Sequence, residues 1–419
     1  MKNRWSIRKS PSLGALVASA FGQGTLLLSG PIAARLLGVT GRGELALLMI
    51  ITAIVSVLGA AGLPTAVAYA ISTQRVPATC IVRLVASTWW RLCLAAGSIS
   101  ALAVVLIARG STTSPIWLEA LLVALLVVLS MTSQLILACV QGEHRFRLLN
   151  WLRPVGGTVY AVGLLCLFLF TRHSGVAPVF GIIVAASLTT CVVGAAFLAV
   201  DWTPTEVGTT VTTRSLLRYG LASLGGANAP LEGLSIDQAV VGLLLSRQKL
   251  GLYVVGSAFD NLSSLLVSGI GTIALPRIAG APDHESRRAL MRRTAFLAIA
   301  LAGGTALLAE AIVGWILPVA FGSDFAGAIP TARILILAGF FMALRRILVV
   351  FLQAIGRPGH TAVGEGIALL TLFAFAAVLV PILGLVGASV ALLAAAMAAN
   401  LYLLRALRKY AVGPQFEAP

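Results

Sequence analysis

The sequence has 419 residues, of which 59% are hydrophobic and 11% charged, with a net charge of +16 and a mean hydropathy of +0.99. A water-soluble protein cannot hide so much apolar surface, because its surface-to-volume ratio forces polar residues outward. The composition therefore excludes a soluble globular protein and indicates helices that are solvated by lipid.

Apolar runs long enough to cross the hydrocarbon core recur from Pro11 to Tyr402. They predict an all-α polytopic membrane protein with about twelve transmembrane helices, since a spanning helix needs roughly 20 apolar residues. The predicted spans are 11–34, 45–72, 84–108, 118–140, 155–171, 179–200, 219–246, 250–276, 294–318, 329–355, 362–382 and 384–404.

Basic residues predict the orientation of these spans. Most of the 30 lysines and arginines fall in connections on the side of the N-terminus. Because cytoplasmic loops collect Lys and Arg, both termini are predicted to be cytoplasmic, in a multi-pass protein of the cell (inner) membrane. The charges are scattered over short loops, which argues against nucleic acid as a partner.

Two halves of six spans, 1–204 and 205–419, suggest an internal duplication. The segment 35–44 (RLLGVTGRGE) joins two spans in the first half, and 243–252 (LLLSRQKLGL) does so in the second. The opening helix of each half is also interrupted, at Pro31 and at Pro230. Paired interruptions favour a transport pathway between parallel repeats, and close helix packing by the neighbouring glycines is the alternative.

Several motifs follow one another in a characteristic order along the chain. They are ARLLGVTGRGE at 34–44, GLPTAVAY at 62–69, Asp237, LGLY at 250–253, FGSDFA at 321–326, LQAIGRP at 352–358 and PILGLVGA at 381–388. In this order and spacing the chain resembles the polysaccharide-biosynthesis (oligosaccharide) flippases of O-antigen translocase type. These belong to the multidrug/oligosaccharidyl-lipid/polysaccharide (MOP) exporter superfamily.

The resemblance implies two six-helix lobes around a cavity that opens alternately to each side. It also implies a substrate, a polyprenyl-pyrophosphate-linked oligosaccharide, moved from the cytoplasmic to the outer leaflet for surface polysaccharide biosynthesis. Polysaccharide assembly proteins would be its partners. Drug antiporters of the same superfamily share the architecture, so the fold alone does not identify the substrate.

Arginines within the spans are the candidate ligands for the pyrophosphate. Arginine binds phosphate oxygens bidentately, and a charge within the membrane is a functional hypothesis by default. Arg345 and Arg346 lead; adjacent helical positions point about 100° apart, so one of them is expected to face the cavity. Snorkelling to the headgroups is the alternative. Arg333, Arg91 and Arg35 are weaker candidates, and Arg35 is placed either at the outer cavity mouth or in solvent.

Polar and acidic residues in the spans are candidates for coupling or gating: Asp237, Glu232, Asn228, Asp260 and Glu310. A carboxyl group in a low-dielectric cavity can carry a proton or bind sodium, and the alternative is a structural ion pair with an arginine. Which ion is coupled, if any, is left open. Three further acids near predicted span ends are interpreted as interfacial: Glu44, Glu119 and Glu365.

Enzyme motifs are absent from the sequence: it has no Walker motif, no GxGxxG after a strand and no Ser/His/Asp pattern. The five cysteines and four histidines show no metal-ligand spacing, so neither a metal nor another cofactor is predicted. Two other functions stay open. A drug antiporter would need an acidic, aromatic cavity, and a membrane polysaccharide polymerase or glycosyltransferase would need a larger extramembrane loop than 201–218 or 277–293.

Overall fold

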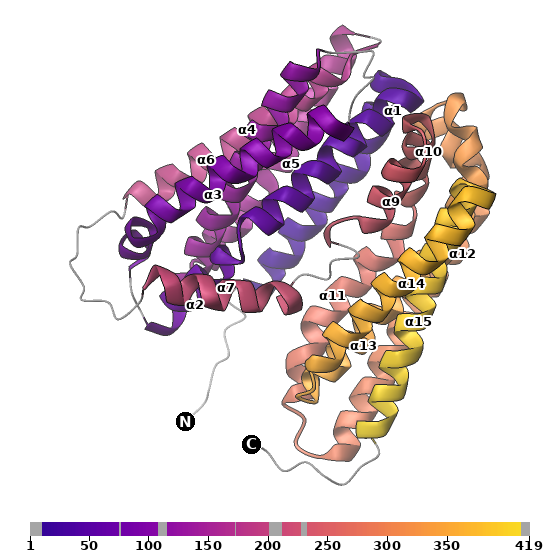
Figure 1. The fold of residues 1–419 in the computed structure, drawn as a ribbon. Helices are drawn as coiled ribbons and strands as arrows, with labels where there is room; N and C mark the ends of the chain where they lie inside the picture. The colour runs from indigo at the N-terminus through magenta and orange to yellow at the C-terminus, as the bar shows by residue number, and fades with distance from the viewer. Residues whose placement is uncertain are drawn as a thin grey trace. The chain divides into compact units, whose positions relative to one another are not determined.

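The computed structural model describes residues 11–74, 77–107, 115–171, 173–200, 212–227 and 233–411. Within these ranges the chain forms α-helices, one short 3-10 helix and turns, and it contains no strand (Figure 1). Nine of the described helices are long and apolar enough to cross a membrane. The prediction of an all-α polytopic membrane protein is thus confirmed, whereas the count of twelve spans and the cytoplasmic termini stay predictions.

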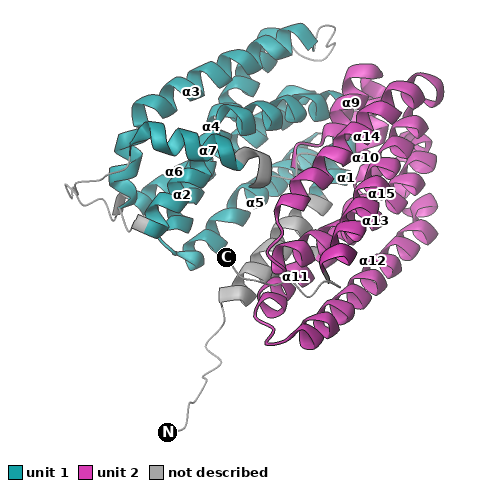
Figure 2. Cartoon of the chain, turned by 60° about the horizontal axis from the view of Figure 1, so that its bottom comes forward, with its two compact units in different colours: residues 1–37, 44–227 teal, residues 38–43, 228–419 magenta. Residues whose placement is uncertain are grey.

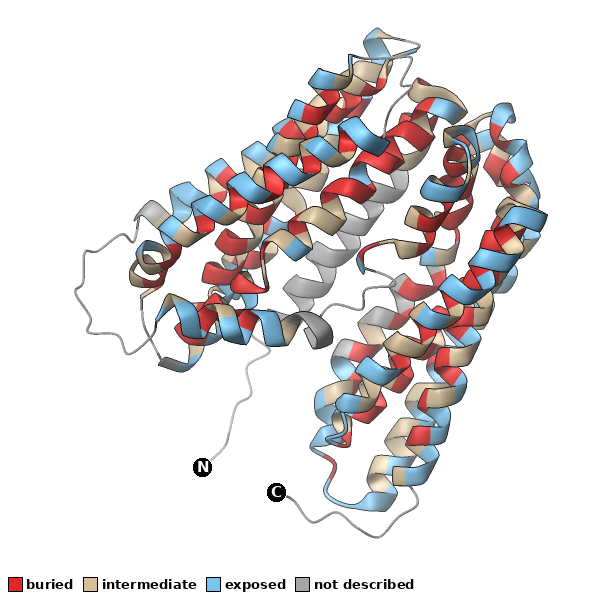
Figure 3. Cartoon of the chain, viewed as in Figure 1, coloured by how far each residue is buried: buried red, intermediate tan, exposed pale blue. Residues whose placement is uncertain are grey.

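The outward faces of the helices are apolar. Figure 3 shows buried residues on one side of most helices and exposed residues on the other. The exposed side carries large apolar side chains such as Phe170, which is 87% exposed, and Leu370, which is 72% exposed. Two of the exposed tryptophans, Trp117 and Trp151, lie near the starts of their helices. Lipid tails solvate such side chains, and tryptophan favours the membrane interface.

The described helices form two compact units, 1–37 with 44–227 and 38–43 with 228–419 (Figure 2). A division into six-helix lobes at residue 204 stays a prediction.

Unit 1 is organised around one central helix, α4 (Ile116–Gly142), which packs against α2, α3, α5 and α6. α7 packs against α2 and α3. The other helices of the unit are α1 (Pro11–Gly59, without its segment 38–43), α2 (Leu63–Gln74), α3 (Ala78–Ile107), α5 (Phe146–Phe170), α6 (Val176–Val200) and α7 (Thr213–Ala227).

Unit 2 is organised around α13 (Ile329–Ala354), which packs against α10, α11, α12 and α15. α15 also packs along α14, so it lies in contact with both α13 and α14. The unit contains α9 (Ile236–Leu244), α10 (Arg247–Ser257), α11 (Asp260–Ala279), α12 (His284–Phe321), the 3-10 helix η1 (Ser323–Ala328), α14 (Gly359–Leu383) and α15 (Leu385–Ala411).

The first two predicted spans differ from the structure in where the helix breaks. The predicted connection 35–44 is helical except at Gly38, whose φ of 66° and ψ of −177° kink α1. Glycine adopts this left-handed φ without steric penalty. Pro31 lies inside the helix, although an interior proline removes a backbone hydrogen bond and crowds the preceding turn; the non-helical backbone lies at Gly38 instead. The predicted span 45–72 is interrupted at Ala61 and Gly62, between α1 and α2.

The seventh and eighth predicted spans are divided in a similar way. The structure has α7, α9, α10 and α11 where two continuous helices, 219–246 and 250–276, were expected. Ser246 separates α9 from α10 and caps α10 by accepting a hydrogen bond from the backbone N–H of Lys249 at 3.4 Å. A serine at this position satisfies one of the free donors of the new helix. Pro230 lies outside the described residues.

The two motifs that suggested a duplication meet in unit 2. A Cβ atom built on Gly43 would lie 1.8 Å from the carbonyl oxygen of Arg247, and one built on Gly251 would lie 2.0 Å from that of Val39. Segment 38–43 and α10 therefore touch backbone to backbone. Small residues permit this approach between membrane helices, where van der Waals packing is a main attractive term.

We expect Gly43→Ala and Gly251→Ala each to destabilise the protein, because the obstructing atoms are backbone and cannot rotate away. Overpacking of this kind costs about 1–3 kcal/mol. Thermal unfolding of the purified protein in detergent measures the effect. Gly366→Ala in α14 is the matched control, since no heavy atom lies within 4 Å of its added Cβ. Equal melting temperatures for all three variants would contradict the contact.

Candidate substrate and coupling site

The central helix of unit 2 carries three of the five arginines proposed from the sequence: Arg333, Arg345 and Arg346. Because α13 packs against four other helices, residues in its middle turns point into protein rather than toward solvent. The structure separates the three side chains into three different environments.

Arg345 forms an ion pair within unit 2. Its guanidinium donates to the carboxylate of Glu365 on α14, and the two side chains are 5% and 12% exposed. Glu365 lies among packed helices, and its interpretation as interfacial, which concerns depth in the membrane, stays a prediction. A carboxylate in this position neutralises the arginine, which a buried charge requires.

Arg346 points to another side of α13, as expected for adjacent helical positions. It lines a small polar cavity of about 90 Å³ between α9, α11, α13 and α15. The other polar residues of this cavity, which we call the polar cavity, are Ser235, Asp237, Gln238, Asp260, Asn261 and Ser264.

Hydrogen bonds and close packing hold the walls of the polar cavity. Gln238 donates to the hydroxyl of Ser257 at 3.3 Å, and the amide of Asn261 donates to the carbonyl of Ser257 at 3.2 Å. On α13, Gly339 allows a close approach to α11, because an added Cβ would lie 2.4 Å from the carbonyl oxygen of Asp260. Gly339 precedes Arg346 by two helical turns, so both lie on the face toward α11.

Two of the proposed coupling acids share this cavity. Asp237 is 8% exposed in the first turn of α9, and Asp260 begins α11. The cavity therefore combines two carboxylates with one guanidinium. Asn228 and Glu232 lie outside the described residues.

None of the remaining described candidates is among the residues that line the polar cavity. Glu310 and Arg333 form an ion pair at 3.3 Å between α12 and α13, with side chains 43% and 57% exposed. Arg91 on α3 and Arg35 on α1 are exposed residues of unit 1. The structure thus brings together Asp237, Asp260 and Arg346 and leaves these four outside that group.

Sequence reasoning missed most of the uncharged cavity residues. Asn261 and Ser264 follow Asp260 in the first turns of α11, and this cluster of polar residues at a helix start was an available signal. Two acids interpreted as interfacial are also buried: Glu44 is 2% exposed and Glu119 is 1% exposed. Among the described residues no group of His, Cys, Asp and Glu could hold a metal ion.

A family profile described as "Polysaccharide biosynthesis protein" matches residues 15–281, more than half of the chain. The chain belongs to this family. Its members and its structural relatives are transporters and flippases rather than enzymes. No curated protein sequence is detectably similar to this chain.

Solved structures of similar fold come from the MOP superfamily. One is the lipid II flippase MurJ in an inward closed conformation, with a TM-score of 0.78 at 12% identity, covering 94% of this chain and 87% of that one. Another is an inward-facing multidrug resistance MATE family transporter, with a TM-score of 0.72 at 14% identity and 95% and 99% coverage. At this identity the likeness establishes the fold alone, which this chain shares with MurJ and the MATE transporters.

We expect Glu365→Gln to destabilise the protein strongly, because it leaves the charge of Arg345 buried without its carboxylate. Breaking one side of a buried pair costs about 3–5 kcal/mol. The double variant Arg345→Met/Glu365→Gln should recover much of this loss in thermal unfolding. Arg333→Gln is the control: it breaks an exposed pair worth at most about 1 kcal/mol. A stable Glu365→Gln protein would show that the pair is dispensable.

Proposed function

We propose that this protein moves a polyprenyl-pyrophosphate-linked oligosaccharide from the cytoplasmic to the outer leaflet by alternating access. Its family is named for polysaccharide biosynthesis, and one structural relative is described as a lipid II flippase. The observation that carries the proposal is Arg346, a cation on the central helix of unit 2 that shares a cavity with two carboxylates. A lipid tail can stay in the bilayer while the phosphates and sugars need a polar path.

The size of the polar cavity supports a coupling role. Its volume of about 90 Å³ is well below the roughly 300–1,000 Å³ of typical small-molecule sites, which suits a few waters or one cation rather than a sugar chain. Two carboxylates and one guanidinium leave one negative charge. A proton or a sodium ion bound by Asp237 or Asp260 would neutralise this charge. The carboxyl groups would then attract Arg346 less strongly, so its guanidinium could bind another anion. We therefore assign ion coupling to the polar cavity and place the glycan outside it.

Arg346 is then the residue through which ion binding and phosphate binding influence each other. Carboxylates and phosphates compete for the same donors of a guanidinium, since both accept bidentate hydrogen bonds. When Asp237 and Asp260 are neutralised, Arg346 binds phosphate more favourably. When they are ionised, the arginine returns to these carboxylates. Arg91 and Arg35 stay as proposed phosphate ligands in unit 1.

Drug antiport is the second candidate function. The multidrug transporters among the structural relatives share the fold, and Asp237 with Asp260 could attract an organic cation. Against it stands the volume of the polar cavity, about 90 Å³, since drug-sized ligands occupy cavities of about 300–1,000 Å³. The cavity also has no aromatic residue among those described that line it.

In a strain lacking this protein, we expect lipid-linked oligosaccharides to accumulate while the surface polysaccharide disappears. Lipid extraction and quantification of polyprenyl-pyrophosphate glycans measure the first effect, and staining of surface polymer the second. Wild type and Arg333→Gln should restore the polymer, whereas Arg346→Ala should not, at matched membrane abundance. Unchanged lipids together with increased sensitivity to cationic compounds would replace the flippase proposal by drug antiport.

Ion coupling has its own test in proteoliposomes. We expect transport of a polyprenyl-pyrophosphate glycan to respond to an imposed proton or sodium gradient, and Asp237→Asn to remove that response because the amide binds neither ion as a carboxylate does. Glu310→Gln changes an exposed acid outside the polar cavity and should keep the response. Gradient-dependent transport by Asp237→Asn at the wild-type level would exclude Asp237 as the coupling residue.

A further inference from the structure

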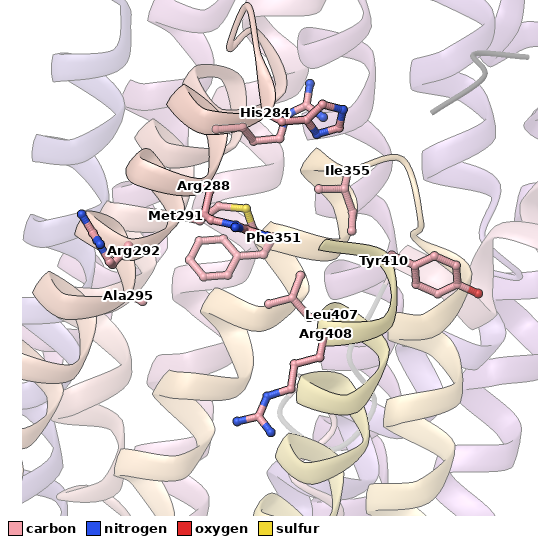
Figure 4. Close-up of a pocket in the computed structure, with 11 residues that line it drawn as sticks. His284, Arg288, Met291, Arg292, Ala295, Phe351, Ile355, Leu407, Arg408 and Tyr410 are labelled. Carbon is pink, nitrogen blue, oxygen red and sulfur yellow. The ribbon is translucent and has the colours of Figure 1, made fainter. Parts of the chain in front are cut away.

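Unit 2 contains a second, larger cavity of about 410 Å³ where α12 begins and where α13 and α15 end (Figure 4). Five basic side chains line it, from two helices that are distant in the sequence. They are His284, Arg287, Arg288 and Arg292 on α12 and Arg408 on α15. The concentration of guanidinium groups points to an anionic ligand, and we call this cavity the basic cavity.

The floor of the basic cavity is apolar. Met291, Phe351 and Leu407 come from α12, α13 and α15 and gather between the three helices (Figure 4). Phe351 is only 3% exposed, so the floor is continuous with the packed core of unit 2. A soluble anion would make no apolar contact with this floor. A ligand with a charged head and an apolar body matches both parts.

Tyr410 forms a wall that its neighbours hold in place. The guanidinium of Arg357 lies 4.8 Å from the centre of its ring, and the ring of His360 lies 5.2 Å away. His360 in turn is hydrogen-bonded to Tyr402 at 2.8 Å. The wall is thus anchored in α14 and α15, and a cation over an aromatic face stabilises such an arrangement.

The length and charge pattern of α12 place the basic cavity at the level of lipid headgroups. The helix has 38 residues and spans about 57 Å, whereas the hydrocarbon core is about 30 Å thick. Its charges are concentrated before Thr294, and the next turn exposes Phe296 and Leu297, at 71% and 53%. The arginines therefore precede the lipid-facing part of the helix by one to two turns.

The acids at the start of α12 lie outside the cavity. Asp283 caps the helix by accepting hydrogen bonds from the backbone N–H and the hydroxyl of Ser286, at 2.7 and 2.9 Å. These hydrogen bonds lower the pKa of the Asp283 carboxyl, so it stays ionised as the cap. Neither Asp283 nor Glu285 is among the residues that line the cavity.

We propose that the basic cavity binds an anionic membrane phospholipid. The phosphate contacts the arginines of α12 and Arg408, and the first part of an acyl chain lies on the apolar floor. Arginine suits this role because its planar donors match phosphate oxygens. By the distribution of basic residues, this end of the unit is the predicted cytoplasmic side, where anionic lipids concentrate. The proposal does not depend on the transported substrate.

Lipid binding to the purified full-length protein tests this site. Native mass spectrometry with phosphatidylglycerol and phosphatidylcholine of identical acyl chains should show preferential retention of phosphatidylglycerol. Arg292→Gln/Arg408→Gln should weaken its binding roughly 10-fold or more, since each arginine near a lipid surface contributes appreciably. The matched control, Arg293→Gln/Arg405→Gln, removes the same charge from the same two helices at exposed positions that do not line the cavity.

Three outcomes would overturn the proposal. Equal weakening by both double variants would mean general attraction to a basic surface rather than a site. Displacement of phosphatidylglycerol by millimolar inorganic phosphate would identify a soluble phosphate ligand. If a polyprenyl diphosphate displaced bound phosphatidylglycerol at a lower concentration than added phosphatidylglycerol does, the cavity would be a substrate site instead. Because all four substituted arginines are exposed, the variants should fold normally, which thermal unfolding verifies.

Discussion

The need to neutralise charge inside a lipid-solvated helical bundle is the constraint on which the rest of unit 2 depends. An uncompensated arginine in such an interior would cost many kcal/mol, so Arg345 fixes Glu365 beside it. The pair joins α13 to α14, two helices that otherwise meet mainly through α15. It also fixes the rotation of α13 about its axis. Arg346, about 100° further round, is thereby directed to the polar cavity.

Close backbone approach is the second element of this arrangement. Gly339 lets α13 touch α11 at Asp260, two turns before Arg346. The buried pair thus sets the rotation of the central helix, and the glycine sets its distance from α11. A polar cavity of only about 90 Å³ is the consequence, small enough that one ion changes its charge balance. A site of this kind can respond to a proton or sodium ion without containing the transported glycan.

Sequence alone predicted the membrane class, the helical architecture and the family, because these follow from long apolar runs and from motif order. It located the helix breaks less well. Pro31 attracted attention as a helix breaker, but it lies inside α1, and the non-helical backbone occurs at Gly38, where φ is positive. Asp237, Asp260 and Arg346 were identified singly. That they share one cavity depends on helix packing, which a single sequence does not encode locally. The pairing of Glu365 with Arg345 was not anticipated for the same reason, because the two residues lie on different helices.

The two units differ where a duplication would make them alike. α4 and α13 are the central helices of their units and are the fourth spans of the two predicted halves. α4 carries Glu119 as its only charged residue, near its start, whereas α13 carries Arg333, Arg345 and Arg346. Packing alone does not require arginines in a central helix, since α4 fills that position with apolar side chains. The arginines of α13 are therefore not required by its central position, and burying Arg345 fully and Arg346 partly has an energetic cost. That cost is the physical reason for assigning the ion-responsive chemistry to unit 2.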